Sequence, residues 1–356
     1  MEIINLVPEK YKEWDEFCRQ SDDAWFWHTS DGLEYMLNYR PALEPNSLSF
    51  MVRENSRIVA VIPLIVEKYD GLAEFSFGGD YNFIPALAND LPPKQKEKVL
   101  KFIFEKIDTL AKENGICRSK FRFPILNKSF IETGNQKSNF LPKFDYLDAS
   151  LSTQVIDLNK PITELRREVR HGHDSDIDKA GRVFKSETFN KTNINPDNFG
   201  EYVKMHRKAA GRITRPKATF DIMYKTIKEG ESFLVAAKRD GVFVGFAYFL
   251  GYKNNVYYGS GCNDPELENL PVSHFVQWSA IEWMNLMKYR FYEIGWHRYS
   301  INLFDQPTAK EAHISRFVRG FGGVTVPLFR GEKYYDKDYF SKVFAKRLAD
   351  YWELIS

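Results

Sequence analysis

Residues 233–252 read FLVAAKR-DG-VFVGFAYFLGY, and this stretch decides the fold class. Two runs rich in β-branched and aromatic residues flank Asp240-Gly241, a pair typical of a two-residue β-hairpin turn. After the turn at Asn254-Asn255, residues 256–261 (VYYGSG) form a third such run. The sequence therefore predicts three consecutive antiparallel strands.

The same order of elements occurs twice in the chain. A helix over about 271–288 and a strand at 290–296 (RFYEIGW) follow the three strands. In the first half, we expect strands at 49–54, 57–66 and 73–77, a helix over about 92–114 and a strand at 116–123. We therefore predict a mixed α/β fold with two similar domains, 1–155 and 156–356. Each would have a mixed, mostly antiparallel sheet flanked by helices, and the second would end in a C-terminal helix.

Composition narrows the function. The 356 residues include 50 Lys+Arg and 48 Asp+Glu, a net charge of +2, whereas a protein that coats DNA is expected to be strongly basic. We expect no DNA partner. Cys18, Cys117 and Cys262 show no CxxC spacing, which fits a reducing compartment. The acidic N-terminus is unlike a signal peptide, and no run approaches the ~18–20 apolar residues of a membrane span. We expect a cytoplasmic protein with at most peripheral membrane contact.

Several catalytic signatures are missing from the chain. GxxxxGK[ST], GxSxG and HExxH do not occur, which weighs against nucleotide hydrolysis, elbow-type serine hydrolysis and zincin proteolysis. His171 and His173 precede three aspartates in alternation, but they follow a helical pattern and are more typical of a solvated helix end. We expect no metal and no tightly bound cofactor.

A basic stretch follows the helix predicted over 196–210. His206 lies on the apolar face of that helix, so it is either a core histidine or a base or substrate contact in a cleft. Arg212 and Arg215 fall on the next loop. They are either solvated or hold an anion such as a sugar nucleotide, a lipid phosphate or the acceptor end of a tRNA.

Residues 307–323 contain another helix that ends in Gly320-Phe321-Gly322-Gly323. Glycines at a helix end first serve backbone geometry. Lys310, Arg316 and Arg319 on this helix either face solvent or line a cleft.

At these residues the chain resembles the Fem-type aminoacyltransferases, the FemAB-like branch of the GNAT N-acyltransferase superfamily. The stretches that carry the likeness are Trp14 to Trp27-His28 with 60–64 (AVIPL), 165–180 (LRREVRHGHDSDIDKA), 206–212 (HRKAAGR) through Tyr257-Tyr258 to 292–295 (YEIG), and 310–323 (KEAHISRFVRGFGG). The resemblance implies two tandem GNAT-like domains with a substrate channel between them, and we place the channel chiefly with 156–356.

The resemblance also implies the reaction. It is the transfer of an acyl or aminoacyl group to a primary amine of a small-molecule or lipid-linked precursor of the cell envelope or a surface polysaccharide. The donor would be aminoacyl-tRNA, or alternatively acyl-CoA. For catalysis we assign Asp80, His206, Glu293, Lys310 and Arg319; for substrate binding, Arg212, Arg215, Tyr257, Tyr258, His274 and Arg316.

Two departures from the family pattern leave alternatives open. Val318 occupies the position of the family's lysine, with Arg319 beside it. The loop at 263–271 (NDPELENLP) has three acids and no glycine, which disfavours a CoA pyrophosphate at the following helix. The alternatives are an acetyl-CoA-dependent N-acetyltransferase acting on an amino sugar, and a catalytically inactive FemAB-like binding protein.

Overall fold

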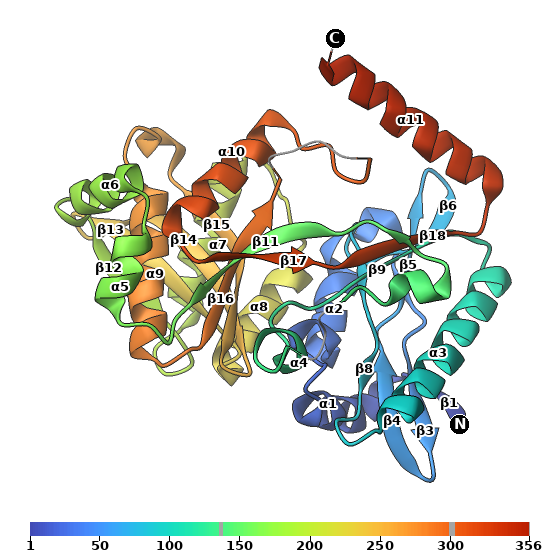
Figure 1. Cartoon of the computed structure of the whole chain (residues 1–356). Coiled ribbons are helices and arrows are strands. Elements are labelled where there is room, and N and C mark those ends of the chain that lie inside the picture. The colour runs from blue at the N-terminus through green and yellow to red at the C-terminus, as the bar shows by residue number, and fades with distance from the viewer. Residues whose placement is uncertain (135–137, 299–302, 356) are drawn as a thin grey trace. The chain divides into compact units, whose positions relative to one another are not determined.

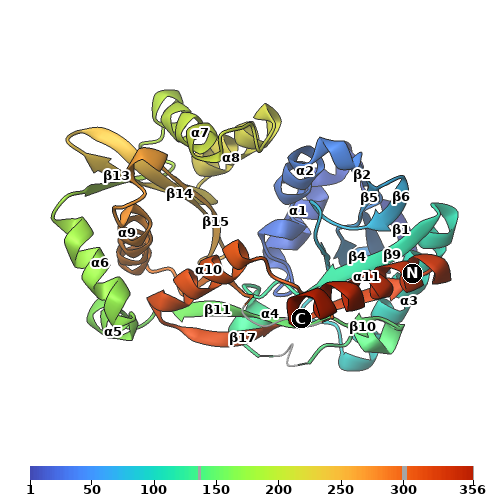
Figure 2. The same ribbon diagram turned by 90° about the horizontal axis from the view of Figure 1, so that it is seen from above.

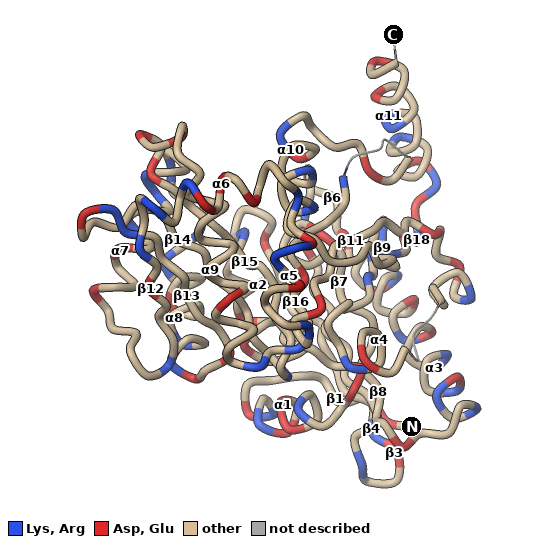
Figure 3. The backbone as a smooth tube through the Cα atoms, turned by 60° about the vertical axis from the view of Figure 1, so that its left-hand side comes forward, with Lys and Arg blue, Asp and Glu red and all other residues tan. Residues whose placement is uncertain are grey.

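The computed structural model describes residues 1–134, 138–298 and 303–355 and divides the chain into two compact units (Figure 1). The first unit contains 1–152, 298–309 and 327–356, and the second contains 153–297 and 310–326. Lysine and arginine are interspersed with aspartate and glutamate in both units, as the near-neutral net charge predicts (Figure 3). Within the described residues, every helix is too short or too polar to cross a bilayer.

The first unit has two sheets. The smaller has the order β1-β3-β4-β8 and the larger β10-β18-β9-β6-β5-β2, with β7 also paired to β9. Their strands are β1 (Glu2–Asn5), β2 (Asn46–Ser47), β3 (Phe50–Glu54), β4 (Arg57–Ile62), β5 (Ile65–Tyr69), β6 (Leu72–Phe75), β7 (Asn82–Phe83), β8 (Ala86–Leu87), β9 (Ile116–Arg122), β10 (Leu147–Asp148) and β18 (Arg330–Tyr334). The helices are α1 (Tyr11–Gln20), α2 (Ser30–Tyr39), α3 (Pro93–Glu113), α4 (Lys128–Ile131) and α11 (Lys337–Ile355).

The helix and closing strand expected in the first half are confirmed. Helix α3 buries Val99, Ile103 and Ile107 at helical spacing, and it connects the parallel strands β6 and β9. The single strand expected over 57–66 is wrong in one respect, because Pro63 interrupts it. Proline has no N–H to donate to a ladder. The chain leaves one sheet as β4 and enters the other as β5.

The second unit has one seven-stranded sheet with the order β12-β13-β14-β15-β16-β11-β17. The strands are β11 (Leu151–Asp157), β12 (Lys185–Phe189), β13 (Ser232–Arg239), β14 (Val242–Tyr252), β15 (Asn255–Asn263), β16 (Phe291–His297) and β17 (Val324–Leu328). The expected hairpin is confirmed, since Asp240 and Gly241 both have positive φ, at 51° and 82°, as a type I′ turn requires.

Helices cover both faces of this sheet (Figure 2). The helices α7 (Pro196–Ala210) and α8 (Lys217–Glu229) lie on one face, and α9 (Val272–Leu286) and α6 (His171–Gly181) on the other. Helix α7 has the predicted bounds, with Gly211 at φ 64° after its end. The remaining helices are α5 (Ile162–Glu168) and α10 (Ala309–Val318). The charged helix at 165–180 is in fact α5 and α6, because Val169 and Arg170 adopt extended backbone between them.

The chain returns to the first unit after it has formed the second. Strand β11, which follows the first unit in the chain, lies beside β16 in the second unit's sheet. Strand β18, which follows the second unit, pairs with β9 in the first unit's sheet over five residues. The placement of the C-terminal segment in domain 156–356 is therefore wrong: β18 and α11 belong to the first unit.

A buried charge network holds the returning segment in the first unit. Glu332 of β18 is 1% exposed, and the Nη2 atom of Arg347 in α11 lies 2.9 and 3.0 Å from its two carboxylate oxygens. Tyr81 and Tyr334 also donate hydroxyl hydrogen bonds to Glu332. Burial acts to raise the pKa of Glu332, but Arg347, the charge of Arg118 and the Tyr334 hydroxyl lower it to about 2. The sequence around Glu332 gives no local signal of this network.

Candidate functional site

The parallel strands β15 and β16 diverge in the second unit. They pair only where residues 255–257 face 291–293. Beyond that point β15 runs to Asn263 paired only with β14, and β16 runs to His297 beside β11. The opening between their carboxyl ends is called the wedge here. Ligands of open α/β sheets bind at such carboxyl ends, where neighbouring strands part.

The corresponding place in the first unit is filled. Strand β6 ends at Phe75, and the short strand β7 then pairs with β9 opposite Phe121 and Arg122. The Oδ1 atom of Asn82 in β7 accepts a hydrogen bond at 3.0 Å from the backbone N–H of Ile65. Because the chain itself occupies this space, the second unit carries the candidate site.

Tyr258 and Gln277 lie on the α9 side of the wedge. A side chain at Gly261 would overlap the Tyr258 hydroxyl, so the phenol lies along β15 toward its open end. The hydroxyl of Tyr292 donates a hydrogen bond at 2.7 Å to Oε1 of Gln277. Burial raises the pKa of Tyr258 to about 12, although the Gln277 side chain and the charge of Arg215 act to lower it. At neutral pH the phenol is therefore a hydrogen-bond donor.

Tyr257 and Glu293 lie on the opposite face of the sheet. They are register partners across the parallel pair, so their side chains leave the same face side by side. The Glu293 side chain is 6% exposed, and Oε1 accepts a hydrogen bond at 2.9 Å from Thr153. A buried carboxylate at the edge of an opening can take up a proton.

His206 and Arg215 form a close pair beside the wedge. The Nη1 atom of Arg215 donates to Nε2 of His206 at 2.7 Å, and the guanidinium is 8% exposed. Burial and the neighbouring guanidinium lower the pKa of His206 to about 4. The sequence expectation of a base at His206 fits this geometry poorly, because its lone pair already accepts from Arg215. The positive charge of Arg215 in this pair acts to lower the pKa of Tyr258 and of Cys262, against the effect of burial.

His274 lies in the first turn of α9, with its ring centroid 4.4 Å from that of His173. Its Nε2 atom is 3.8 Å from Oδ2 of Asp176. Burial and then the charge of His173 lower the pKa of His274 to about 4. His173 hydrogen-bonds through Nε2 to the carbonyl oxygen of Phe317, so its place is structural.

The other assigned residues are scattered. Asp80 belongs to the first unit, where Arg122 lies 3.2 Å from its carboxylate. Arg212, Lys310 and Arg316 are exposed, and the described structure does not bring them to the wedge. The Nε atom of Arg319 donates to the carbonyl oxygen of Ser315 at 3.3 Å.

The position of the family lysine is a core position here. Val318 is 2% exposed and packs close to Gly295 of β16, while Arg319 is half-buried on a different side of the chain. Arg319 also lowers the pKa of His297, whose Nε2 atom lies 2.7 Å from Oε1 of Gln154.

Sequence reasoning missed Gln277 and Thr153. Gln277 is a long polar side chain on the buried side of α9, among mostly apolar neighbours such as Val276, Trp278 and Ile281, which is a usable signal. Thr153 has no such signal, because threonine is common in strands.

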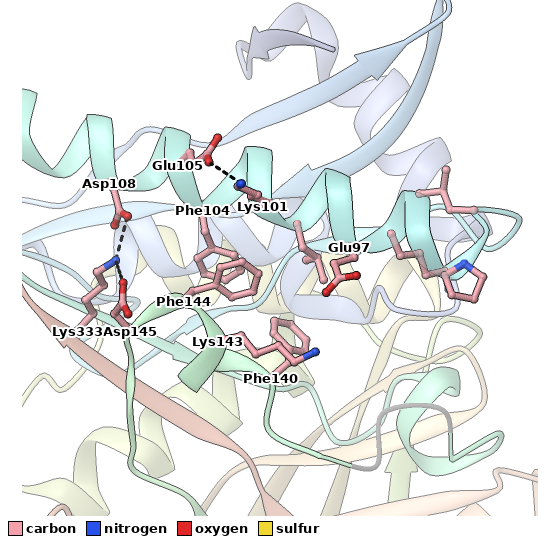
Figure 4. A pocket seen from close by; sticks show the side chains of 14 residues that line it. Glu97, Lys101, Phe104, Glu105, Asp108, Phe140, Lys143, Phe144, Asp145 and Lys333 are labelled. Atoms are coloured by element: carbon pink, nitrogen blue, oxygen red, sulfur yellow. Dashed lines mark hydrogen bonds and ion pairs between the residues drawn. The ribbon is translucent and has the colours of Figure 1, made fainter.

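A cavity with a volume of about 710 Å³ lies elsewhere, in the first unit (Figure 4). Its floor includes Phe104 stacked on Phe144 at 4.2 Å. On its rim Lys333 is 2.9 Å from Asp108 and 3.7 Å from Asp145. None of the residues assigned from the sequence lines this cavity, so it is not the candidate site.

No family model and no curated protein matches the chain. Solved structures do match. FemX has a TM-score of 0.64 at 11% identity, covering 97% of this chain and 100% of that one. L-PGS from Bacillus licheniformis has a TM-score of 0.61 at 11% identity, covering 97% of each chain. A tandem GNAT protein from the clavulanic acid biosynthesis pathway has a TM-score of 0.53 at 12% identity, covering 94% of this chain and 98% of that one.

At these identities the likeness concerns the fold. It confirms the predicted architecture of two GNAT-like domains in tandem, and it runs over nearly the whole chain. The reaction has to be argued from the site.

Proposed function

We propose that the protein is an acyltransferase that moves an acyl or aminoacyl group to a primary amine, with the reaction taking place at the wedge of the second unit. The observation that carries the proposal is the divergence of β15 and β16 after three residue pairs, which leaves an open strand edge beside Tyr258 and Glu293. The fold shared with FemX and L-PGS supports the same reaction class.

In this proposal, different residues at the wedge take up the proton and stabilise the oxyanion. The amine must lose a proton as its nitrogen attacks the carbonyl carbon of the donor, and Glu293 accepts that proton. The carbonyl oxygen becomes negative in the tetrahedral intermediate, and the Tyr258 hydroxyl with the open amides of β15 stabilises it. The carbonyl then re-forms, and the alcohol or thiol of the donor leaves with a proton.

We propose aminoacyl-tRNA as the donor. Loop 263–271, which leads to the start of α9, has no glycine amides for a CoA pyrophosphate. Lys208 pairs with Asp264 and Glu266 at 2.8 and 2.9 Å, and Glu268 lines a cavity at the head of α9. Arg215 supplies positive charge close to Tyr258, suited to a phosphate or carboxylate group. The acceptor we propose is a small or lipid-linked cell-envelope or surface-polysaccharide precursor with a free amine, modified in the cytoplasm. The three free cysteines fit a reducing compartment.

The test is a transfer assay with a mixture of radiolabelled aminoacyl-tRNAs and, separately, acetyl-CoA, each offered with amine acceptors at fixed salt. Salt is held constant because phosphate contacts weaken steeply as it rises. Label moving from one charged tRNA to an amine supports the proposal and identifies the amino acid. The matched variants are Glu293→Gln, expected to lose ~10²–10⁴ in turnover, and Glu282→Gln on the exposed side of α9, expected to lose none.

Two other functions give different results in the same assay. Transfer from acetyl-CoA alone indicates an N-acetyltransferase acting on an amino sugar. Binding of a precursor without transfer from either donor indicates a catalytically inactive binding protein. The buried Val318 at the family's lysine position is the observation that favours the inactive protein.

A further inference from the structure

A second cavity, of about 540 Å³, lies at the head of α9 in the second unit. Its wall combines the end of β15, the loop that leads to α9, the first turn of α9, and parts of α6 and α10. Asn263 joins two of these parts, because its Nδ2 atom donates to Oγ of Ser273 at 2.5 Å. Gln277 lies one turn further along α9, so the cavity adjoins the wedge.

The charge of this cavity is unusual for its position. The start of a helix after a strand normally favours a phosphate, because the helix N–H groups point outward. Here the lining includes the carboxylates of Asp176 and Glu268 and neither lysine nor arginine. Lys179 lies 3.5 Å from Asp176 but is itself largely exposed. Arg170 contacts His173 from behind. A bound anion would face two like charges.

The acceptor atoms of the cavity are arranged for a cation. Oδ2 of Asp176 and Nε2 of His274 are 3.8 Å apart. One nitrogen atom can lie about 2.8 Å from both, which is the usual length of a charge-assisted hydrogen bond. Burial lowers the pKa of His274 to about 4, so the ring is neutral at pH 7, and the tautomer with its proton on Nδ1 presents a lone pair at Nε2.

The rest of the lining is mixed. Phe317 and Ile314 of α10 and Leu267 and Leu270 of the loop supply apolar surface, and the polar residues are Asn263, Asn269, Ser273 and His313. Such a combination, apolar surface with a few convergent polar groups, is typical of sites for small organic molecules.

We propose that this cavity binds the ammonium group of a primary-amine substrate between Asp176 and His274, with its carbon skeleton against Phe317 and Ile314. Identifying that amine as the acyl acceptor rests on the proposed function, but the binding does not. The carboxylates at the head of α9 thus select a cation where a phosphate would otherwise be expected.

The test measures equilibrium binding by calorimetry with pairs of probes that differ in the amine alone. The pairs are glucosamine with glucose, and n-butylamine with n-butanol, so a sugar and a non-sugar carrier are compared. Coenzyme A is the anionic probe. The variants are Asp176→Asn and His274→Gln, with Glu282→Gln as a control for charge on α9. Circular dichroism confirms that each variant is folded.

At least one amine is expected to bind at least tenfold more tightly than its alcohol. Asp176→Asn should remove about tenfold of that affinity, consistent with a hydrogen bond to a charged group, and Glu282→Gln should remove none. Equal binding of amine and alcohol, or tighter binding of coenzyme A that Asp176→Asn strengthens, would overturn the proposal. Amine binding without any acyl transfer would instead leave this cavity assigned and refute the proposed reaction.

Discussion

Arg215 holds His206 as a neutral acceptor, with Nη1 and Nε2 2.7 Å apart. Arginine has no lone pair to offer, so the direction of the hydrogen bond is fixed. The histidine therefore orients the guanidinium beside Tyr258 and Cys262. His206, which the sequence suggests as a base, thus positions the Arg215 guanidinium in this structure.

Three largely buried histidines, His206 among them, make the free energy of unfolding depend on pH. His206, His274 and His297 all have a pKa lowered from 6.5 to about 4, mainly by burial. Between these values the unfolded chain binds more protons than the folded one, so stability is lost as the pH falls from 6.5 toward 4. At pH 5 each histidine is expected to cost about 1 kcal/mol after allowance for partial exposure.

Urea unfolding at pH 7.5, 6.0 and 5.0 measures this loss. Replacing His297 by Gln should make the pH profile shallower across that window. The pKa of Glu332 is lowered from 4.5 to about 2, so the stability that this carboxylate contributes is lost mainly below pH 4.5, under the measured pH range. An unchanged slope in the variant would contradict the assignment.

Turnover should depend on the Tyr258 hydroxyl. Tyr258→Phe removes the proposed donor to the oxyanion and is expected to lower turnover by about 10²-fold with little change in stability. Tyr289→Phe is the matched control, because that half-buried tyrosine packs on Phe233 just beyond the C-terminal end of α9. Equal activity of the two variants would show that Tyr258 only packs.

Two glycines with the same backbone angle give a test of crowding. Gly241 and Gly323 both have φ at 82°, but a Cβ at Gly241 meets nothing within 4 Å, whereas one at Gly323 overlaps the carbonyl oxygen of Val155. Gly241→Ala is expected to cost about 1 kcal/mol from strain alone, and Gly323→Ala about 3 kcal/mol or more. Thermal unfolding of both variants measures the difference, and similar values would refute the close approach.

The charge network in the first unit predicts a large cost for Arg347→Met. Removing this arginine deprives the 1%-exposed Glu332 of two contacts and is expected to destabilise by about 3 kcal/mol. The exposed pair of Lys217 and Asp221 provides the control, since Lys217→Met should cost less than about 1 kcal/mol. Urea unfolding compares the two, and equal costs would mean that the buried network adds nothing.

The elements that local sequence could predict are those with local causes. Asp240-Gly241 specifies its own turn, and Asn195, Pro196 and Gly211 bound α7 at the predicted residues. The interruption at Pro63 was also readable in principle. The partner of β18 was not, because pairing with β9 joins residues more than 200 positions apart and no short pattern records it.

For the candidate site, too, the sequence predicts some features and not others. Tyr258 and Glu293 could be selected because their strands were recognised, and Arg215 because its loop was. Their environments could not be predicted, because the pKa and the hydrogen bonds of each group depend on which residues pack against it. Whether His206 is a base or an acceptor depends on Arg215, nine residues away on the loop that follows α7.

The late return of β18 to the first unit has a consequence for how the chain folds during synthesis. The N-terminal part of the chain leaves the ribosome first, so the first unit initially lacks β18 and β9 is an edge strand. Arg118, which pairs with Glu74, then lacks its contacts with Glu332 and Tyr334. An unprotected edge of this kind is prone to intermolecular pairing. The first unit can therefore close only after residues 330–334 have been made, and the nascent protein is expected to need protection from aggregation until then.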